Sequence, residues 1–446
     1  MRLKKTTALA LAAATFFGAS LSPAPCGTPL KTAEAAFAPN TADRTPYEEN
    51  TAIDPYGQTY FRAQPVILRV RRETMETTGK KVPWSGFGCF YPPGEIEHIF
   101  SVLGKEAKEE EEEALSGKRM PIYRSKFVQR MDWSVTSILE SHAAYQGGMR
   151  GRFGVFGRNY DTREGRELAL DDMFTDTAAL AELIAARLRA DYPGVTFRDT
   201  LDEKLLEKAG GDHLQWTLFA RGATFYFTPF DIVAGSDRYD AGQMIYTATI
   251  FFDEAPELFV EEYRKGSAAW SFEVEPLMPV RVPLGDGTTA MLSVYGKKIH
   301  LGDHELVEED PLRYQRCTFV SLMDGRRYLY VDFAPYARGE TLPHELRVYR
   351  LSSDGIERLP GSRPLTMLAS VEDEDDLLIL PMTSPGNFCL CEAVEPGEEP
   401  NDFYRWMTIR DIGHIDHNQL FEEEKAHVHY HVGPDGWPEE GAMRDY

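Results

Sequence analysis

Three Asp-Gly dipeptides between residues 280 and 360 divide that part of the chain into short segments, and they restrict its fold more than any other feature. They lie at Asp286-Gly287, Asp324-Gly325 and Asp354-Gly355. Asp-Gly is favoured in two-residue β-hairpin turns because these turns need backbone conformations with positive φ. Between them, segments such as Arg327 to Phe333 and Glu345 to Leu351 alternate as strands do. We therefore predict that residues 272–446 form an all-β C-terminal domain, either a sandwich or a partial propeller.

The segment before this domain mixes strand and helix periods. Ile96, Ile99, Phe100 and Leu103 have the i, i+3, i+4, i+7 spacing of a helix with one buried stripe. The pattern predicts helices at 94–115, 177–190 and 202–208 and one that begins near Pro256, and Asp176 is the expected N-cap of the second. It predicts strands at 60–75, 122–131, 134–145, 216–220, 224–228 and 243–252. The helices are too few and too irregular for a Rossmann or TIM-barrel series, so we predict a mixed α+β unit.

The first residues have the pattern of a secretory signal peptide. Arg2, Lys4 and Lys5 precede an apolar run, and small residues follow as far as Ala35. A basic start, an apolar stretch too short to span a bilayer and an A-x-A site are typical of a cleaved leader. We expect a signal peptide over 1–35, a flexible lead-in over 36–57, no later membrane span and a secreted or envelope-associated mature protein. Lipid anchoring at Cys26 is the alternative.

Composition restricts the class of partner. The chain has 446 residues, 42% of them hydrophobic, which is enough for two to four folded domains. Its formal net charge of −23 repels phosphate backbones and argues against nucleic-acid binding. The same charge would favour a cationic partner.

Four cysteines remain beyond the predicted leader: Cys89, Cys317, Cys389 and Cys391. In an oxidising compartment we expect a bridge from Cys317 to either Cys389 or Cys391. A single C-x-C pair with no second pair is weak evidence for zinc.

Several motifs in the middle of the chain follow one another in the order known from one family. They are Tyr145-x-Gly147-Gly148, Asn159-Tyr160-Asp161-Thr162-x-x-Gly165, Leu170-Asp171-Asp172-Met173-Phe174, Phe225-Tyr226-Phe227-Thr228-Pro229-Phe230-Asp231-Ile232 and Tyr239-Asp240-Ala241-Gly242. In these motifs the chain resembles the PdaC/RsiV-like superfamily of extracytoplasmic domains. The resemblance implies a PdaC-type domain over 58–150 and an RsiV-like paired domain over 151–268. It also implies recognition of a cell-wall-active protein such as lysozyme, or of a peptidoglycan fragment.

The chain departs from this family at two places. Met149-Arg150 stands where members usually have Ala-His, and the segment between Ile232 and Tyr239 is longer than usual. Both departures fall in expected loops, so they weaken the transfer of binding specificity more than the fold. The candidate ligand-binding residues are Phe230, Asp231 and Tyr239, although aromatic residues in this stretch also fit a packing role.

The histidines near the C-terminus are the strongest chemical candidate. On a strand, His427, His429 and His431 would share one face, with side chains about 6–7 Å apart. Imidazole nitrogens in that arrangement are able to bind a transition metal, and the alternative is a histidine-rich edge strand. No Gly-x-Ser-x-Gly elbow is present, and we assign no catalytic residue.

We therefore expect a non-catalytic binding or sensing protein outside the cytoplasm, which needs no cofactor. The alternative is a metal-dependent hydrolase that acts on cell-wall polysaccharide through the C-terminal histidines.

Overall fold

The chain is mostly β-structure with few helices. The computed structural model describes residues 51–53, 59–61, 67–77, 80–90, 95–115, 122–144, 152–235, 245–275, 278–309, 312–337, 340–341, 345–370, 376–379, 381–392 and 429–440. The expected leader with Cys26, and the candidates Tyr239 and His427, lie outside these ranges. Among the described helices, none combines the length and the apolar character that a membrane crossing requires.

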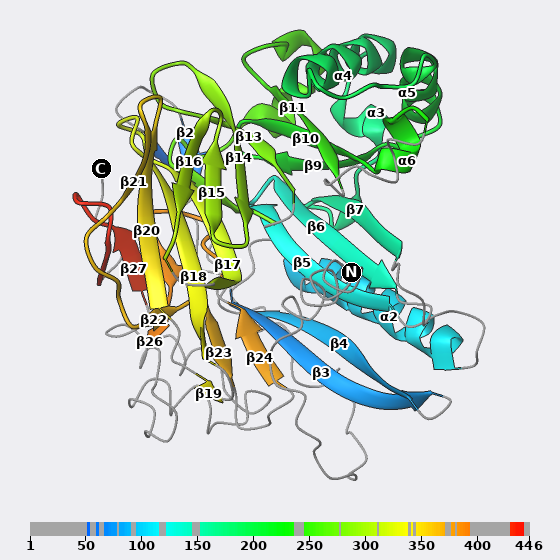
Figure 1. Cartoon of the computed structure of the whole chain (residues 1–446). Helices are drawn as coiled ribbons and strands as arrows, with labels where there is room; N and C mark the ends of the chain where they lie inside the picture. Colours follow the sequence, from blue (N-terminus) through cyan, green and yellow to red (C-terminus); the bar gives the residue numbers. More distant parts are fainter. Residues whose placement is uncertain are drawn as a thin grey trace, which may run out of the picture.

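One of the first strands of the chain pairs with a strand from the C-terminal part of the sequence. β1 (Thr51–Ile53) pairs with β2 (Thr59–Phe61), and the long hairpin β3 (Ile67–Thr77) and β4 (Lys80–Phe90) follows. The predicted strand 60–75 is thus two strands. β24 (Asp376–Ile379) pairs with β3, and β23 (Leu368–Ser370) completes the four-stranded sheet. β3 and β4 therefore lie beside β24 and β23, although the two pairs are far apart in the sequence (Figure 1).

A second sheet lies beside the longest helix. Helix α2 (Ile96–Leu115) buries Ile99, Phe100 and Leu103, as its periodicity predicts. The sheet has the order β5 (Ile122–Met131), β6 (Val135–Ala144), β7 (Arg152–Asp161) and β8 (Arg166–Glu167). The domain boundary that we predict between residues 150 and 151 falls between β6 and β7, which pair over ten positions. The division into domains stays a prediction.

Apart from α2, the described helices gather on one small antiparallel sheet, at the upper right of Figure 1. The sheet consists of β9 (Gln215–Phe219), β10 (Gly222–Phe227) and β11 (Tyr246–Phe251). The helical elements are α3 (Leu170–Met173), α4 (Thr177–Asp191), α5 (Leu201–Gly210), α6 (Pro229–Ile232) and the 3₁₀ turns η3 (Pro256–Leu258) and η4 (Glu261–Arg264). Asp176 caps α4 by accepting hydrogen bonds from the backbone N–H groups of Ala178 and Ala179, as predicted.

The helix expected near Pro256 is only one 3₁₀ turn. Phe259 adopts an extended conformation and pairs with Phe174, and the N–H of Val260 donates to the carbonyl of Met173 at 2.9 Å. These tertiary hydrogen bonds replace the intrahelical ones that a longer helix would make.

Two sheets of the C-terminal region share one apolar core. The first contains β12 (Trp270–Glu273), β17 (Leu312–Ser321), β18 (Arg327–Ala337), β20 (Glu345–Ser352) and β21 (Gly355–Arg358), with β19 (Glu340–Thr341) beside β18. The second contains β13 (Val280–Pro283), β14 (Thr289–Tyr295), β15 (Lys298–Leu301) and β16 (His304–Val307). Leu292, Ile299, Phe319 and Leu329 belong to the same buried cluster, so the two sheets pack against each other.

The opposite face of β17, β18 and β20 carries a separate core that includes Val320, Tyr330 and Phe388. It is covered by short strands, namely β22 (Leu365–Thr366), β25 (Phe388–Cys389), β26 (Cys391–Glu392), β27 (His429–Val432) and β28 (Pro438–Glu440). The three Asp-Gly turns connect antiparallel strands as predicted, with φ of 88° at Gly287, 91° at Gly325 and 136° at Gly355.

One buried ion pair joins the C-terminal sheets to the strands before them. Arg316 of β17 donates through Nε to the carboxylate of Glu273 in β12 at 2.7 Å, and both side chains are almost fully buried. The same carboxylate accepts from the backbone N–H of Val128 in β5 at 2.5 Å. Gln129 donates to the Glu273 carbonyl at 2.7 Å. Glu273 therefore links β5, β12 and β17.

Candidate functional site

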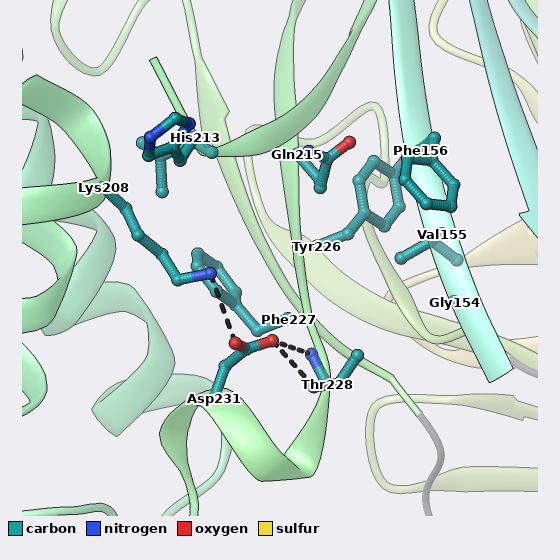
Figure 2. A pocket seen from close by; sticks show the side chains of 11 residues that line it. Gly154, Val155, Phe156, Lys208, His213, Gln215, Tyr226, Phe227, Thr228 and Asp231 are labelled. Carbon is teal, nitrogen blue, oxygen red and sulfur yellow. Dashed lines mark hydrogen bonds and ion pairs between the residues drawn. The ribbon is translucent and has the colours of Figure 1, made fainter. Parts of the chain in front are cut away.

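A small surface pocket lies where β7 approaches β9 and β10 beside α5 and α6. Its volume is about 180 Å³. Eleven residues line it: Gly154, Val155, Phe156, Lys208, His213, Leu214, Gln215, Tyr226, Phe227, Thr228 and Asp231. Figure 2 shows it with Lys208 and His213 on one side and Phe156, Tyr226 and Gln215 on the other.

The pocket exists because β7 lies directly against β9. A Cβ atom at Gly157 would overlap the backbone of Trp216, so only glycine fits at this position. The Asn159 side chain donates to the carbonyl of Trp216 at 2.8 Å, and the N–H of Gly157 donates to the Gln215 side-chain oxygen at 3.3 Å. These contacts hold Phe156 and Gln215 at the same pocket.

The apolar wall contains three aromatic rings with different exposure. Tyr226 and Phe227 are buried, whereas the side chain of Phe156 is 43% exposed. The Tyr226 hydroxyl shares a hydrogen bond of 2.7 Å with Thr217, and burial raises the pKa of Tyr226 above its ordinary value. Tyr226 is therefore a neutral structural wall, and Phe156 is the exposed ring of the three.

The polar wall is organised by Asp231, one of the residues predicted from sequence. Thr228 and Asp231 form a capping box at the start of α6: Thr228 donates to one carboxylate oxygen through its hydroxyl at 2.7 Å and its N–H at 3.1 Å. Lys208 of α5 lies 3.2 Å from the other oxygen. Although partial burial by itself would raise it, these partners hold the pKa of the Asp231 carboxyl below its usual range.

The other two ligand candidates do not line the pocket in the described part of the chain. Phe230 is 54% exposed and its carbonyl accepts a hydrogen bond from Arg198 at 2.9 Å. It is absent from the residues that line the cavity. Tyr239 falls outside the described residues.

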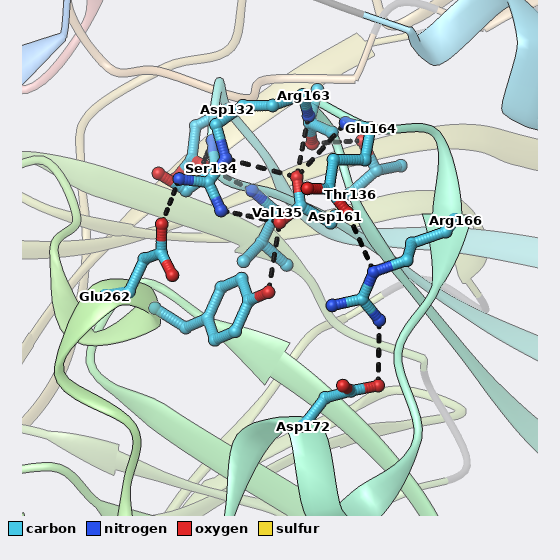
Figure 3. A network of polar contacts seen from close by, with 12 residues as sticks. Asp132, Ser134, Val135, Thr136, Asp161, Arg163, Glu164, Arg166, Asp172 and Glu262 are labelled. Carbon is cyan, nitrogen blue, oxygen red and sulfur yellow. Dashed lines mark hydrogen bonds and ion pairs between the residues drawn. The ribbon is translucent and has the colours of Figure 1, made fainter.

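A second polar cluster surrounds Asp161 at the end of β7 (Figure 3). The buried Asp161 carboxylate accepts from the backbone and side chain of Arg163 and from the Tyr263 hydroxyl at 3.0 Å. Burial and this hydrogen bond raise the pKa of Tyr263 to about 12. Arg163 also pairs with Glu262. These partners occupy both Asp161 oxygens and tie the β7–β8 turn to η4, so the cluster is structural.

The structure describes only part of the predicted histidine cluster. His429 and His431 belong to β27, and Tyr430 between them is buried. The ring of His431 lies 3.6 Å from a carboxylate oxygen of Glu439. Within the described ranges, which exclude His427 and the side chain of His429, no group of three or more His, Cys, Asp or Glu side chains could hold a metal ion.

The structure describes the cysteines of the expected disulfide only in part. Cys317 carries a free, buried thiol and belongs to the core between the two C-terminal sheets. Phe388 and Leu390, the neighbours of Cys389, belong to the core on the opposite face. Successive residues of a strand point to opposite faces of its sheet. Since β25 covers the face opposite to the one that carries Cys317, the Cys317 side chain points away from β25. The side chain of Cys391 is outside the described set.

No protein-family model matches the chain, and no curated protein matches it. Among the solved structures that align with part of it, two are DUF3298 family proteins. The one from Pseudomonas aeruginosa is 15% identical, with a TM-score of 0.32 over 46% of this chain and 98% of the other. The one from Bacteroides fragilis is 16% identical, with a TM-score of 0.27 over 43% of this chain and 92% of the other.

Sequence reasoning identified Asp231 but missed the other polar and exposed groups of the pocket. Phe156, Lys208, His213 and Gln215 come from three separate segments and belong to no motif. One signal was available: Gly154 and Gly157 flank two apolar residues, and a glycine inside a strand often marks a close backbone approach.

Proposed function

We propose that this chain is a secreted or envelope-associated recognition protein that binds a peptidoglycan fragment in the pocket at β7 without transforming it. The observation that carries the proposal is the accessible ring of Phe156 at a preformed pocket whose other aromatic walls are buried. An aromatic face beside a few polar groups is a common arrangement in small-molecule sites. We also propose, from the motif order, that residues 58–268 form a PdaC/RsiV-like pair of domains.

The size of the pocket favours binding of one part of a larger ligand. Its volume of about 180 Å³ is below the roughly 300–1,000 Å³ of pockets that enclose a whole drug-sized ligand. One ring or one side chain fills it, and the rest of the ligand would extend over the surface. A glycan chain presents such rings one at a time.

The pocket has a single carboxylate in its described lining, which favours binding over hydrolysis. Glycosidases generally use two carboxyl groups, one as an acid and the other as a base or nucleophile. Asp231 is the one carboxylate among the described lining residues, and Thr228 and Lys208 occupy both of its oxygens. Its lowered pKa keeps it ionised, so it is a poor proton donor.

The test is calorimetric titration of the full chain with a soluble disaccharide-peptide from peptidoglycan. We expect saturable binding that Phe156→Ala weakens by about tenfold or more, because the stacking surface is lost. Tyr295→Ala is the matched control, since Tyr295 is an aromatic residue 57% exposed on β14 in a different sheet. Equal affinity of the wild type and the Phe156→Ala variant would reject this pocket.

Two further measurements separate the rival functions. If the target is a lysozyme-like protein bound by the acidic surface, lysozyme will bind at low salt and Phe156→Ala will not change its affinity. If the protein is a metal-dependent hydrolase, the purified chain will contain stoichiometric metal that His429→Ala removes, and it will release reducing ends from cell-wall glycan.

A further inference from the structure

We infer that the group bound in this pocket is a ring that carries a carboxylate. The inference rests on the proposed function and adds the charge of the ligand to it. It is drawn from the hydrogen-bonding groups that the pocket residues leave uncommitted.

Three side chains of the lining, Lys208, Gln215 and His213, have N–H donors for which the described residues supply no partner. Lys208 has three N–H donors, and its one ion pair in the described structure is with Asp231. The Gln215 side-chain oxygen accepts from Gly157, which leaves its NH₂ group as a donor. His213 is exposed and supplies another ring N–H.

The one carboxylate in the lining does not act as a counterpart for a cationic ligand. Thr228 donates twice to one oxygen of Asp231, and Lys208 lies at the other. These contacts fix Asp231 as part of the α6 cap, and Asp231 in turn positions the ammonium group of Lys208. An acceptor-rich ligand therefore matches the pocket better than a donor-rich one.

The arrangement of the walls orients such a ligand. Lys208 and His213 lie on one side, from α5 and the segment after it, and Phe156 lies on the other side, on β7 (Figure 2). A ring stacked on Phe156 would direct a carboxylate substituent toward Lys208. Hydrogen bonds between charged partners are stronger than neutral ones, so this contact contributes selectivity as well as affinity.

The net charge of the chain determines how binding of an acidic ligand depends on salt. A formal charge of −23 repels anions at long range, and salt reduces that repulsion. The contact with Lys208 acts at short range and is partly buried, so it is screened less. Binding of the acidic ligand should therefore not weaken when moderate salt is added, unlike binding of a basic protein.

The experiment compares N-acetylmuramic acid with N-acetylglucosamine, which differ by a lactyl ether that bears the carboxylate. NMR titration of the full chain is expected to show at least about tenfold tighter binding of the acid, the loss typical of one hydrogen bond to a charged group. Lys208→Met should abolish the preference, and Lys208→Arg should keep it because the charge remains. Lys204→Met, one turn earlier on α5 and outside the pocket lining, is the matched control.

The outcomes distinguish this inference from the proposed function. Equal binding of the two sugars, or a preference that survives Lys208→Met in a folded variant, overturns the inference and leaves glycan recognition standing. Absence of binding by either sugar, together with no effect of Phe156→Ala on the larger fragment, overturns the proposed function and the inference with it.

Discussion

Gly157 of β7 and Trp216 of β9 lie so close that a Cβ atom at position 157 would overlap the carbonyl oxygen of Trp216. The two strands belong to different sheets, β5–β8 and β9–β11, and make no ladder with each other. Their close approach places Phe156 and Gln215 in the same pocket. The pocket therefore depends on the absence of a side chain at position 157.

Replacement of this glycine should destabilise the protein. Gly157→Ala places a methyl group against rigid backbone, and overpacking of this kind costs about 1–3 kcal/mol or more of unfolding free energy. Urea unfolding monitored by tryptophan fluorescence measures the change. Gly194→Ala is the control, because nothing lies within 4 Å of a Cβ atom there. If both variants are equally stable, the approach of β7 to β9 is looser than described.

Asp161 should make stability depend on pH in the acid range. Although burial alone would raise the pKa of its carboxyl, hydrogen bonds from Arg163 and Tyr263 hold it below the usual value. A carboxyl whose folded pKa is depressed contributes stability above its unfolded pKa, about pH 4, and loses it as the pH falls through the folded value.

We therefore expect Asp161→Asn to lower the free energy of unfolding at neutral pH and to flatten its decrease below about pH 4. Urea unfolding at a series of pH values tests this. Asp199→Asn serves as the control at an exposed aspartate. A parallel pH profile for the wild type and Asp161→Asn would show that the Asp161 network adds no acid-sensitive stability.

Loss of one partner of the Glu273–Arg316 pair should cost more than loss of both charges. Arg316→Met leaves a buried, uncompensated carboxylate, which costs about 3–5 kcal/mol. In the double variant with Glu273→Gln, the amide oxygen still accepts from the N–H of Val128 and no charge remains. Chemical unfolding of the two single variants and the double variant should show partial recovery. Additive losses would mean that the two side chains are not coupled.

The thiol of Cys317 should be inert in the folded protein. Burial raises its pKa, and the thiolate is the reactive form. Alkylation followed by mass spectrometry is expected to modify Cys317 only after denaturation, without any reductant. A disulfide would give a different result, namely a cross-linked peptide that contains Cys317 together with Cys389 or Cys391 and that disappears on reduction.

The local sequence pattern correctly predicted several helices and strands. The stripe of Ile99, Phe100 and Leu103 predicted α2, and Asp176 predicted the start of α4. Both signals depend on residues within one or two turns of each other, so they survive in any tertiary context. The helix expected at Pro256 failed for the opposite reason, because Phe259 and Val260 bond to a distant segment instead.

The strand that carries the site was not predicted. Residues 152–161 contain Gly154 and Gly157, which weaken the apolar alternation, so no strand was assigned there. The same glycines allow the close approach to β9. The feature that obscured β7 in the sequence is thus the feature that lets it form the pocket.

The sequence by itself determined α2, α4 and α5, several strands such as β5, β6 and β10, and the Asp-Gly hairpins, because each depends on neighbours along the chain. It also indicated Asp231, although the motif does not show whether that carboxylate faces a ligand or caps a helix. Tertiary structure alone decided the pocket, since Phe156, Lys208 and Gln215 meet only when β7, α5 and β9 pack together. It also decided that Cys317 faces away from β25. Contacts between distant segments depend on how whole faces pack, and no local pattern encodes that packing.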